Sequence, residues 1–275
     1  MGEGPEIGEG PEIGEGPQIG DALLRLDTIT RRLRRECPWD REQDERTIVP
    51  HTLEEAYELA DAAQRRDDAK LLDELGDVLF QVHFLSLLLE ERGAGDLAGV
   101  ASHITEKLIR RHPHVFGSAE AETAGEVLRN WDAIKATEAG REQGVFGEVP
   151  ENLPAPLYAR KVQRRAASSG FDFPDAEQPL QSVADELVEL RAATNADERF
   201  HEMGDVLFAA VGAARKLKVD PELALRAAAD RFRGRVQAAV DLAASEGRNW
   251  NDLAPNDQLA LYARARQTQG EPPHR

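Results

Sequence analysis

Each half of the chain carries four acidic residues whose spacing suits the binding of a divalent cation. They form pairs three residues apart: Glu55 and Glu58, Glu74 and Asp77, Glu186 and Glu189, and Glu202 and Asp205. On a helix, residues three apart share a face, so each pair can approach a common point. Converging carboxylates repel one another unless a cation binds between them. Because every donor is an oxygen, the sequence predicts Mg²⁺ sites, at which Mn²⁺ can substitute.

A role in helix capping is the first alternative for one of these residues. Glu55 follows Thr52 in a Thr-x-x-Glu pattern, which is typical of the capping box at the start of a helix. In the second half the capping pattern is Ser182-x-x-Asp185, one position out of register, although Glu186 keeps the register of Glu55. Capping therefore explains one of the two glutamates and leaves the other to a different role.

A di-iron site of the ferritin type is the second alternative use of carboxylates on helices. Such a site needs a Glu-x-x-His pattern on two helices. Inside the predicted helices the pattern occurs only as Glu198-x-x-His201, and it has no counterpart in the first half. We therefore expect metal sites built from oxygen donors alone.

Basic and aromatic residues follow the acidic pairs in both halves, again at helical spacing. Lys107 and Arg111 lie four residues apart, as do Trp131 and Lys135. The corresponding residues of the second half are Arg231, Arg235, Tyr262 and Arg266. Any one of these cations would ordinarily be surface charge. As an ordered set beside a metal site they suit a phosphate chain, which Arg binds through paired N–H groups and Lys binds as a point charge.

The order of these patterns is the same in both halves, which indicates a duplicated helical unit. The clearest repeat is ELGDVLF at residues 74–80, which returns as EMGDVLF at 202–208. Apolar residues recur at helical spacing, with no convincing strand, and predict helices at residues 21–35, 52–64, 68–92, 96–111, 122–138, 157–168, 178–193, 196–218, 221–245 and 256–267. We therefore expect an all-α fold.

Segments rich in Gly and Pro mark the expected domain boundaries. Three near copies of GEGPEI make up residues 2–19, and this composition cannot build an apolar core. We expect a disordered tail over residues 1–20, an N-terminal helical domain over 21–140, a linker over 141–156, a C-terminal helical domain over 157–267, and a disordered tail over 268–275.

Charge and cysteine content restrict the partners and the compartment. Asp and Glu outnumber Lys and Arg by 51 to 34, and the formal net charge of −17 repels nucleic acid and anionic lipid. We therefore expect neither a nucleic-acid polymer nor a membrane as a partner. Cys37 is the only cysteine, which excludes an internal disulfide, and the N-terminus lacks the pattern of a secretory signal. These features predict a cytoplasmic protein.

Seven short motifs carry a more specific signal: CPWDREQ (37–43), TLEEAYEL (52–59), ELGDVLFQV (74–82), KLIRRHPHVFG (107–117), GFDFPD (170–175), DELVEL (185–190) and EMGDVLF (202–208). Together they resemble the motifs of the MazG nucleoside triphosphate pyrophosphohydrolases, in the two-domain form typical of bacteria, from about Asp21 to Arg266. The resemblance implies two tandem MazG-type helical domains, dimerisation and Mg²⁺ dependence. It also implies cleavage of (deoxy)nucleoside triphosphates between the α- and β-phosphates, to a monophosphate and pyrophosphate, as nucleotide-pool house-cleaning.

The resemblance also implies roles for individual residues. The paired carboxylates correspond to the family's metal ligands, and the nucleotide-contacting residues fall on Lys107, Arg111, Trp131 and Lys135. In the second half the sequence departs from the usual Lys, Trp and Lys, with Arg231, Tyr262 and Arg266 in their places. Because the forked guanidinium of Arg differs from the ammonium of Lys, we do not rank the two sites from these residues.

Catalytic roles are a further hypothesis from the sequence. One glutamate of the first pair in each half, Glu55 or Glu186, is expected to orient or deprotonate the attacking water, in addition to its predicted metal contact. Trp39 either stacks on the base of the substrate or anchors the first helix. In two-domain relatives one repeat can carry the activity, and the C-terminal repeat is then the usual candidate.

Two other functions stay open from the sequence. A sister enzyme, such as a dUTP or dCTP pyrophosphatase or a phosphoribosyl-ATP pyrophosphohydrolase, would have similar metal motifs and a narrower choice of substrate. A helical scaffold, in which the acidic residues merely bind a cation, would have no turnover. The products formed from a panel of nucleotides distinguish these three functions.

Overall fold

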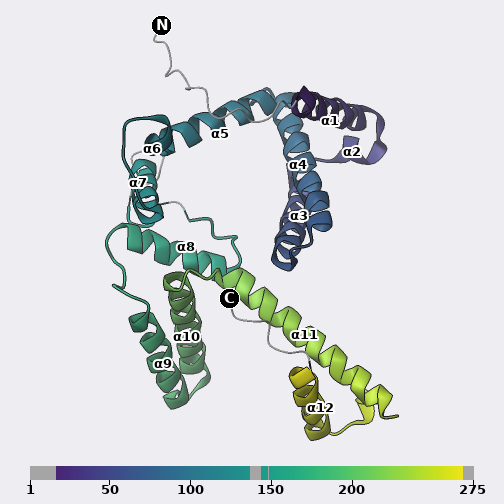
Figure 1. The fold of residues 1–275 in the computed structure, drawn as a ribbon, viewed down its shortest axis with the longest axis vertical. Coiled ribbons are helices and arrows are strands. Elements are labelled where there is room, and N and C mark those ends of the chain that lie inside the picture. The colour runs from purple at the N-terminus through teal and green to yellow at the C-terminus, as the bar shows by residue number, and fades with distance from the viewer. Residues whose placement is uncertain (1–16, 137–143, 148, 269–275) are drawn as a thin grey trace. The chain divides into compact units, whose positions relative to one another are not determined.

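The computed structural model describes residues 17–136, 144–147 and 149–268, and every regular element among them is a helix (Figure 1). This confirms the expected all-α fold. The chain divides into two compact units, Met1–Glu138 and Ala139–Arg275. Most of the predicted tails, and part of the predicted linker, lie outside the described residues. None of the described helices is both long enough and apolar enough to cross a membrane.

A pair of long helices, α3 and α4, forms the centre of the first unit. The described helices of this unit are α1 (Pro17–Glu36), α2 (Pro38–Glu42), α3 (Glu45–Arg65), α4 (Asp68–Glu91), α5 (Leu97–Arg111), α6 (Pro113–Phe116) and α7 (Ala124–Ala136). Helix α4 contacts α1, α3 and α5, and α5 in turn contacts α6 and α7. Helix α4 is therefore the central helix of the unit, because three other helices pack against it.

Apolar packing and ion pairs hold neighbouring helices to α4. Ile48 of α3 is buried against Phe84 and Leu88 of α4. Burying an apolar side chain of this size contributes about 1.5–3 kcal/mol. On the side that faces α1, Arg31 donates hydrogen bonds of 2.9 and 2.6 Å to the two carboxylate oxygens of Glu90. These contacts fix the orientation of α4, on which one of the predicted acidic pairs lies.

The second unit repeats the arrangement of the first. Its described helices are α8 (Ala155–Ser168), α9 (Glu177–Ala192), α10 (Ala196–Lys216), α11 (Pro221–Ser245), the 3-10 helix η1 (Trp250–Asp252) and α12 (Pro255–Thr268). Helix α9 packs on α10 as α3 packs on α4, and α8 contacts α10 as α1 contacts α4. Helix α11 contacts α12 as α5 contacts α7. The duplication that the sequence indicates is therefore present in the packing of the helices.

Two sets of contacts stabilise the second unit. Small side chains bring α11 and α12 close together around a buried core of Ala239, Ala243, Leu261 and Ala265. At the other end, Asp172 of the loop before α9 accepts hydrogen bonds from Arg215 and from Lys216, the latter at 3.0 Å. This ion pair ties the loop to the last turn of α10.

Helix α3 begins earlier than its predicted start at residue 52. The side chain of Asp44 accepts hydrogen bonds from the backbone N–H groups of Arg46 and Thr47, at 2.8 and 2.9 Å, and so caps the helix. Pro50 lies inside the helix, although proline usually marks a boundary. The prediction was wrong here because the cap at Asp44 starts the helix before the proline is reached.

Other helix bounds differ less. Helix α1 takes in residues 17–20, which the composition placed in the tail, and α8 begins before the predicted start at residue 157. The short helices α2, α6 and η1 were not predicted. Helices of about one turn are too short to show apolar periodicity, so only their backbone geometry reveals them.

Candidate functional site

The acidic residues of the first unit lie on two helices joined by a tight turn. Arg66 ends α3 with a left-handed backbone (φ 57°), and the side chain of Asp67 then caps α4 by accepting a hydrogen bond from the backbone N–H of Lys70. A connection this short makes α3 and α4 run antiparallel. The acidic faces of the two helices therefore meet across the hairpin.

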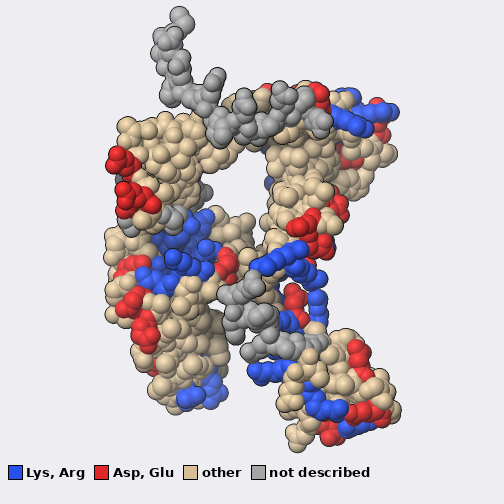
Figure 2. Space-filling view, viewed as in Figure 1, with Lys and Arg blue, Asp and Glu red and all other residues tan. Residues whose placement is uncertain are grey.

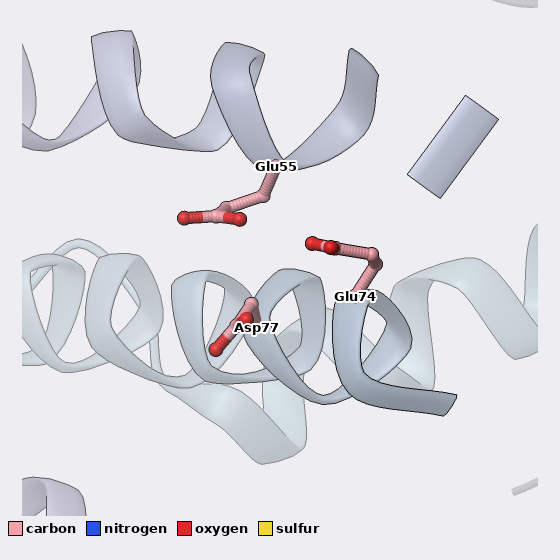
Figure 3. A group of neighbouring side chains, drawn as sticks. All are labelled: Glu55, Glu74 and Asp77. Atoms are coloured by element: carbon pink, nitrogen blue, oxygen red, sulfur yellow. The ribbon is translucent and has the colours of Figure 1, made fainter. Parts of the chain in front are cut away.

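Glu55, Glu74 and Asp77 form the first acidic cluster. One carboxylate oxygen from each lies within 4.8 Å of those from the other two. Figure 3 shows Glu55 of α3 and Glu74 of α4 extending into the space between the helices, with Asp77 beside them on α4. Glu74 is only 4% exposed, whereas Asp77 is exposed. The cluster therefore combines a buried carboxylate with a side that is open to solvent.

The donor atoms of this cluster fit a divalent cation. Oxygens that bind Mg²⁺ at about 2.1 Å lie at most about 4.2 Å from one another. The observed limit of 4.8 Å is only slightly wider. Small rotations of the more exposed side chains would close the difference. Because a buried carboxylate among other carboxylates is unfavourable without a counter-charge, a cation would also stabilise the cluster.

Glu186, Glu189 and Glu202 form the second acidic cluster, in the second unit. Their carboxylate oxygens also lie within 4.8 Å of one another, with two residues on α9 and one on α10. Asn195 caps α10 by accepting a hydrogen bond of 2.9 Å from the backbone N–H of Glu198. The two units therefore present the same kind of donor set on equivalent helical hairpins.

Glu55 and Glu186 occupy equivalent positions and have similar electrostatic surroundings. Burial raises the pKa of the Glu55 carboxyl, and the charge of Asp77 raises it further. Burial likewise raises the pKa of the Glu186 carboxyl, and the charges of Glu189 and Asp205 add to the effect. Neighbouring negative charges favour the protonated form of each carboxyl. These two glutamates therefore bind protons more readily than ordinary glutamates do.

Two predicted ligands, Glu58 and Asp205, belong to neither group of carboxylates whose oxygens lie within 4.8 Å of one another. The charge of Glu58 acts on Glu55, but its carboxylate lies 3.5 Å from the ammonium of Lys70, which also lies 3.5 Å from Glu74. In the second unit the charge of Asp205 acts on Glu186. All the predicted carboxylates are therefore close enough to interact within their own unit, and their roles as ligands stay predictions.

Lys70 is a site residue that was not predicted from the sequence. It bridges the two helices of the hairpin by pairing with Glu58 on α3 and with Glu74 on its own helix. The spacing of Lys70 and Glu74, four residues apart, was visible in the sequence and is typical of an ion pair on one helix. The second contact could not be inferred, because it depends on the register of α3 against α4.

The capping interpretation of Glu55 is wrong. Thr52 lies within α3, and its hydroxyl donates hydrogen bonds of 3.3 Å to the backbone carbonyl of Ile48 and to the side chain of Gln81. Ser182 of the second unit also lies within a helix and donates to a backbone carbonyl. Neither residue caps a helix, so Glu55 is free to act within the cluster.

The di-iron alternative finds no support in the described residues. The Glu198 carboxylate accepts hydrogen bonds from the backbone N–H and the hydroxyl of Thr194, at 2.7 and 2.9 Å. The ring of His201 instead lies edge-on to that of Phe200, with centroids 5.9 Å apart. Glu198 is thus engaged at the start of α10, and His201 belongs to neither acidic cluster.

Arg111, Trp131 and Lys135 form the first basic cluster. The guanidinium carbon of Arg111 lies 5.1 Å from the centroid of the Trp131 ring, and the ammonium of Lys135 lies 4.8 Å from the same centroid. Cations at these distances are attracted by the electron density of an indole ring. The structure therefore brings together residues from α5 and α7 that the sequence predicts to bind phosphate.

Within the first unit, the basic cluster does not lie beside the acidic cluster. Glu74 lies near the start of α4, and the 1.5 Å rise per residue places it about 25 Å from Glu91 at the end of that helix. Helix α5, which carries Lys107, follows that far end and leads away from the α3–α4 hairpin (Figure 1). A site that combines an acidic cluster with basic residues would therefore need residues from outside this unit. The predicted phosphate contacts stay predictions.

The corresponding residues of the second unit lie on α11 and α12. Tyr262 packs against the alanine-rich core, and its ring centroid lies 5.6 Å from that of Phe232. Arg235 is half-buried, whereas Arg231 and Arg266 are exposed. The aromatic residue and the cations are therefore on neighbouring helices, as in the first unit, with Tyr in place of Trp.

Trp39 lies on α2, beside the start of α3. Its ring is edge-on to that of His51, with centroids 5.8 Å apart, and its side chain is half exposed. The contact with His51 ties α2 to α3, whereas the predicted anchoring concerned the first helix, so the anchoring role stays a prediction. The exposed part leaves room for a stacked base, so the binding role stays a prediction.

Comparison with known proteins relates this architecture to a family. A model of the MazG nucleotide pyrophosphohydrolase domain matches residues 43–116, which contain the first acidic cluster. The nucleoside triphosphate pyrophosphohydrolase of Escherichia coli K12 is 40% identical over 233 residues, which are 81% of this chain and 89% of that protein. The chain belongs to the MazG family.

A second MazG relative supports the same assignment. The nucleoside triphosphate pyrophosphohydrolase/pyrophosphatase MazG of Thermotoga maritima is 40% identical over 227 residues, which are 82% of this chain and 87% of that protein. Alignments of this length necessarily include residues of both units. The MazG assignment therefore concerns the whole two-unit architecture, in addition to the segment that the family model matches.

Proposed function

We propose that this MazG chain hydrolyses (deoxy)nucleoside triphosphates between the α- and β-phosphates, to a monophosphate and pyrophosphate, in a Mg²⁺-dependent reaction that clears the nucleotide pool. The observation that carries the proposal is the pair of acidic clusters, each with three carboxylate oxygens within 4.8 Å of one another. They occur in a chain that aligns with nucleoside triphosphate pyrophosphohydrolases over most of its length. A triphosphate would need such cation sites to approach a chain of net charge −17.

The acidic residues would divide the work of binding and proton transfer. When bound, Mg²⁺ screens the phosphate charges and makes a water molecule more acidic. Glu55 and Glu186 are the candidate bases, because each lies in an acidic cluster where the attacking water would be held, and a carboxylate there can accept its proton. Attack at the α-phosphorus breaks its bond to the oxygen that leads to the β-phosphate. That oxygen leaves as part of pyrophosphate.

The first basic cluster and the corresponding basic residues of the second unit would bind the phosphate chain. The guanidinium of Arg111 can donate paired hydrogen bonds to phosphate oxygens, and Lys107 and Lys135 supply further positive charge. The ring of Trp131 attracts the cations of both Arg111 and Lys135, which lie 5.1 and 4.8 Å from the ring centroid. This contact would hold the two cations in a fixed arrangement, which reduces the entropy lost when a substrate binds.

A second copy of the chain would bring acidic and basic clusters together, and we propose that the protein is a homodimer. The hairpins expose apolar side chains, among them Leu72, Leu75 and Leu79 on α4 and Phe200, Met203, Leu207 and Phe208 on α10. In Figure 2 much of the surface of α9 and α10 that is in view carries no charged side chain. Exposed apolar surface on this scale is typical of subunit interfaces. Helical hairpins that pack face to face would bury it.

Product analysis tests the proposed reaction. The wild-type protein, Glu74→Gln, Glu202→Gln and the double variant are incubated with Mg²⁺ and each common ribo- and deoxyribonucleoside triphosphate, and the products are separated by anion exchange. We expect equal amounts of monophosphate and pyrophosphate from the wild type, and a loss of about a thousandfold or more in the double variant. The activity lost in each single variant gives the contribution of one acidic cluster to hydrolysis.

Specific outcomes would contradict the proposal. Formation of a diphosphate and orthophosphate would place cleavage at the γ-phosphate, and full activity of the double variant would exclude both acidic clusters from the reaction. Turnover confined to dUTP, dCTP or phosphoribosyl-ATP would replace the broad house-cleaning role by one of the narrower sister activities.

A further inference from the structure

A positive charge from the chain itself lies in the first acidic cluster. The ammonium of Lys70 is 3.5 Å from a carboxylate oxygen of Glu58 and 3.5 Å from one of Glu74. Glu74 is the buried member of the cluster, with a side chain only 5% exposed. Lys70 therefore neutralises the carboxylate whose negative charge is least stabilised by solvent when no other counter-ion is bound.

The second acidic cluster lacks this feature. The repeat that aligns ELGDVLF with EMGDVLF places Glu198 at the position of Lys70. The Glu198 side chain turns to the start of its own helix, where it accepts hydrogen bonds from Thr194. Among the described residues, no ion pair joins a cation to Glu186, Glu189 or Glu202. The duplicated units have therefore diverged in charge at one equivalent position.

We propose that Lys70 is a tethered cation that competes with divalent metal ions for the first acidic cluster, so that this cluster binds metal more weakly than it would without the lysine. A divalent ion and an ammonium that share the Glu74 carboxylate repel each other, so metal binding requires Lys70 to move away. Its side chain is 43% exposed and has the freedom to do so. The inference rests on the proposed metal sites and adds a difference between them.

A simpler role for Lys70 is an ordinary structural ion pair that fastens α3 to α4. The two roles predict different effects of metal. A structural pair stabilises the hairpin equally with and without a divalent ion. A competing cation stabilises only the metal-free protein, because it is displaced when metal binds.

Binding of Mn²⁺ alone, followed by the electron paramagnetic resonance signal of the free ion, tests the inference. The full chain carries Glu186→Gln and Glu202→Gln, so that binding reports the first cluster, and is compared with and without Lys70→Met. We expect Lys70→Met to lower the Mn²⁺ dissociation constant of this cluster about three- to tenfold. Lys70→Arg, which keeps the charge, should leave the constant within about twofold of the parent value.

Thermal unfolding supplies a second readout on the same proteins. Lys70→Met should lower Tm in EDTA and enlarge the rise in Tm that Mn²⁺ produces. The matched control is Arg65→Met, which removes the ion pair of 2.9 Å between Arg65 and Asp61 on the same hairpin. The control should change Tm by the same amount with and without Mn²⁺.

The outcomes separate the inference from the proposal on which it rests. An unchanged or larger dissociation constant in Lys70→Met, or a change in Tm that is equal with and without Mn²⁺, would overturn the role of Lys70 and leave the metal site standing. Absence of saturable Mn²⁺ binding, with Lys70 present or replaced, would overturn both.

Discussion

Glu55 on α3 and Glu186 on α9 hold the same position in two separate acidic clusters, and burial raises the pKa of both carboxyls. In each case the charges of neighbouring carboxylates raise it further. Gathering carboxylates in this way opposes folding unless a cation is bound. A cost that is present in both units of a duplicated chain points to function, because packing alone would be served better by uncharged residues.

Replacing Glu55 by Gln is expected to stabilise the metal-free protein at neutral pH. Because the folded-state pKa lies above the ordinary value of 4.5, ionisation opposes folding, and stability falls as the pH rises from 4.5 through the raised pKa. The variant removes that charge. In EDTA at pH 7 we expect Tm to rise by about 1–3 °C, and the difference should vanish below the ordinary pKa.

The same variant should lose hydrolytic activity if Glu55 acts in the reaction, so stability and activity change in opposite directions. Glu106→Gln, at an exposed position on α5, serves as the control and should alter neither. A fall in Tm of Glu55→Gln in EDTA at pH 7 would contradict the raised pKa.

Asp172 provides a prediction with the opposite dependence on pH. Hydrogen bonds from Arg215 and Lys216 lower the pKa of its carboxyl from 3.8 to about 2. Its contribution to stability is therefore complete above pH 3.8 and is lost as the pH falls through about 2. Asp172→Asn should lower the unfolding free energy of the second unit by about 1 kcal/mol at pH 7, measured by scanning calorimetry. A penalty of the same size at pH 2 would show that the ion pair is not its cause.

Gly76 and Gly204 lie inside α4 and α10, where glycine lowers helix stability. Among the described residues, a Cβ added at either position meets no atom within 4 Å. Replacement of Gly204 by Ala should therefore raise the unfolding free energy by about 0.5–1 kcal/mol. We also expect hydrolysis to fall several-fold, because a substrate or a second chain would approach the bare backbone there.

The control for this prediction is Gly20→Ala on α1, which also has no atom within 4 Å of the added Cβ and lies on a helix that carries no member of either acidic cluster. It should not affect hydrolysis. Unchanged activity of Gly204→Ala would mean that nothing from outside the chain approaches this part of α10.

Leu207 tests the proposed homodimer. Its side chain on α10 is 61% exposed, and an arginine at this position would place a charge in an apolar interface. We expect Leu207→Arg to convert the dimer to a monomer at micromolar concentration, measured by light scattering during size-exclusion chromatography. Leu225→Arg on α11, at an equally exposed leucine, is the matched control. A wild-type protein that is monomeric throughout this range would contradict the homodimer directly.

The hairpins that carry the acidic clusters could be predicted because their geometry is local. Pairs such as Glu74 and Asp77 share a helical face by spacing alone, and the turn at Arg66 and Asp67 is too short for anything but an antiparallel pair. The repeat of GDVLF then indicated that the second unit would be built in the same way. The start of α3 was not predicted, because the helix is capped at Asp44, before Pro50, and proline usually marks a helix boundary.

The sequence by itself determined the all-helical fold, its duplication and the paired carboxylates from which the acidic clusters are drawn, since periodicity, short turns and repeated motifs act over a few residues. The tertiary structure alone decided that Lys70 reaches Glu58 as well as Glu74, and that α5 carries its basic residues away from the acidic cluster of its own unit. The physical reason is that these relationships depend on the register of two packed helices and on the direction in which a chain leaves a helix end. Neither quantity is encoded in the spacing of residues along one helix.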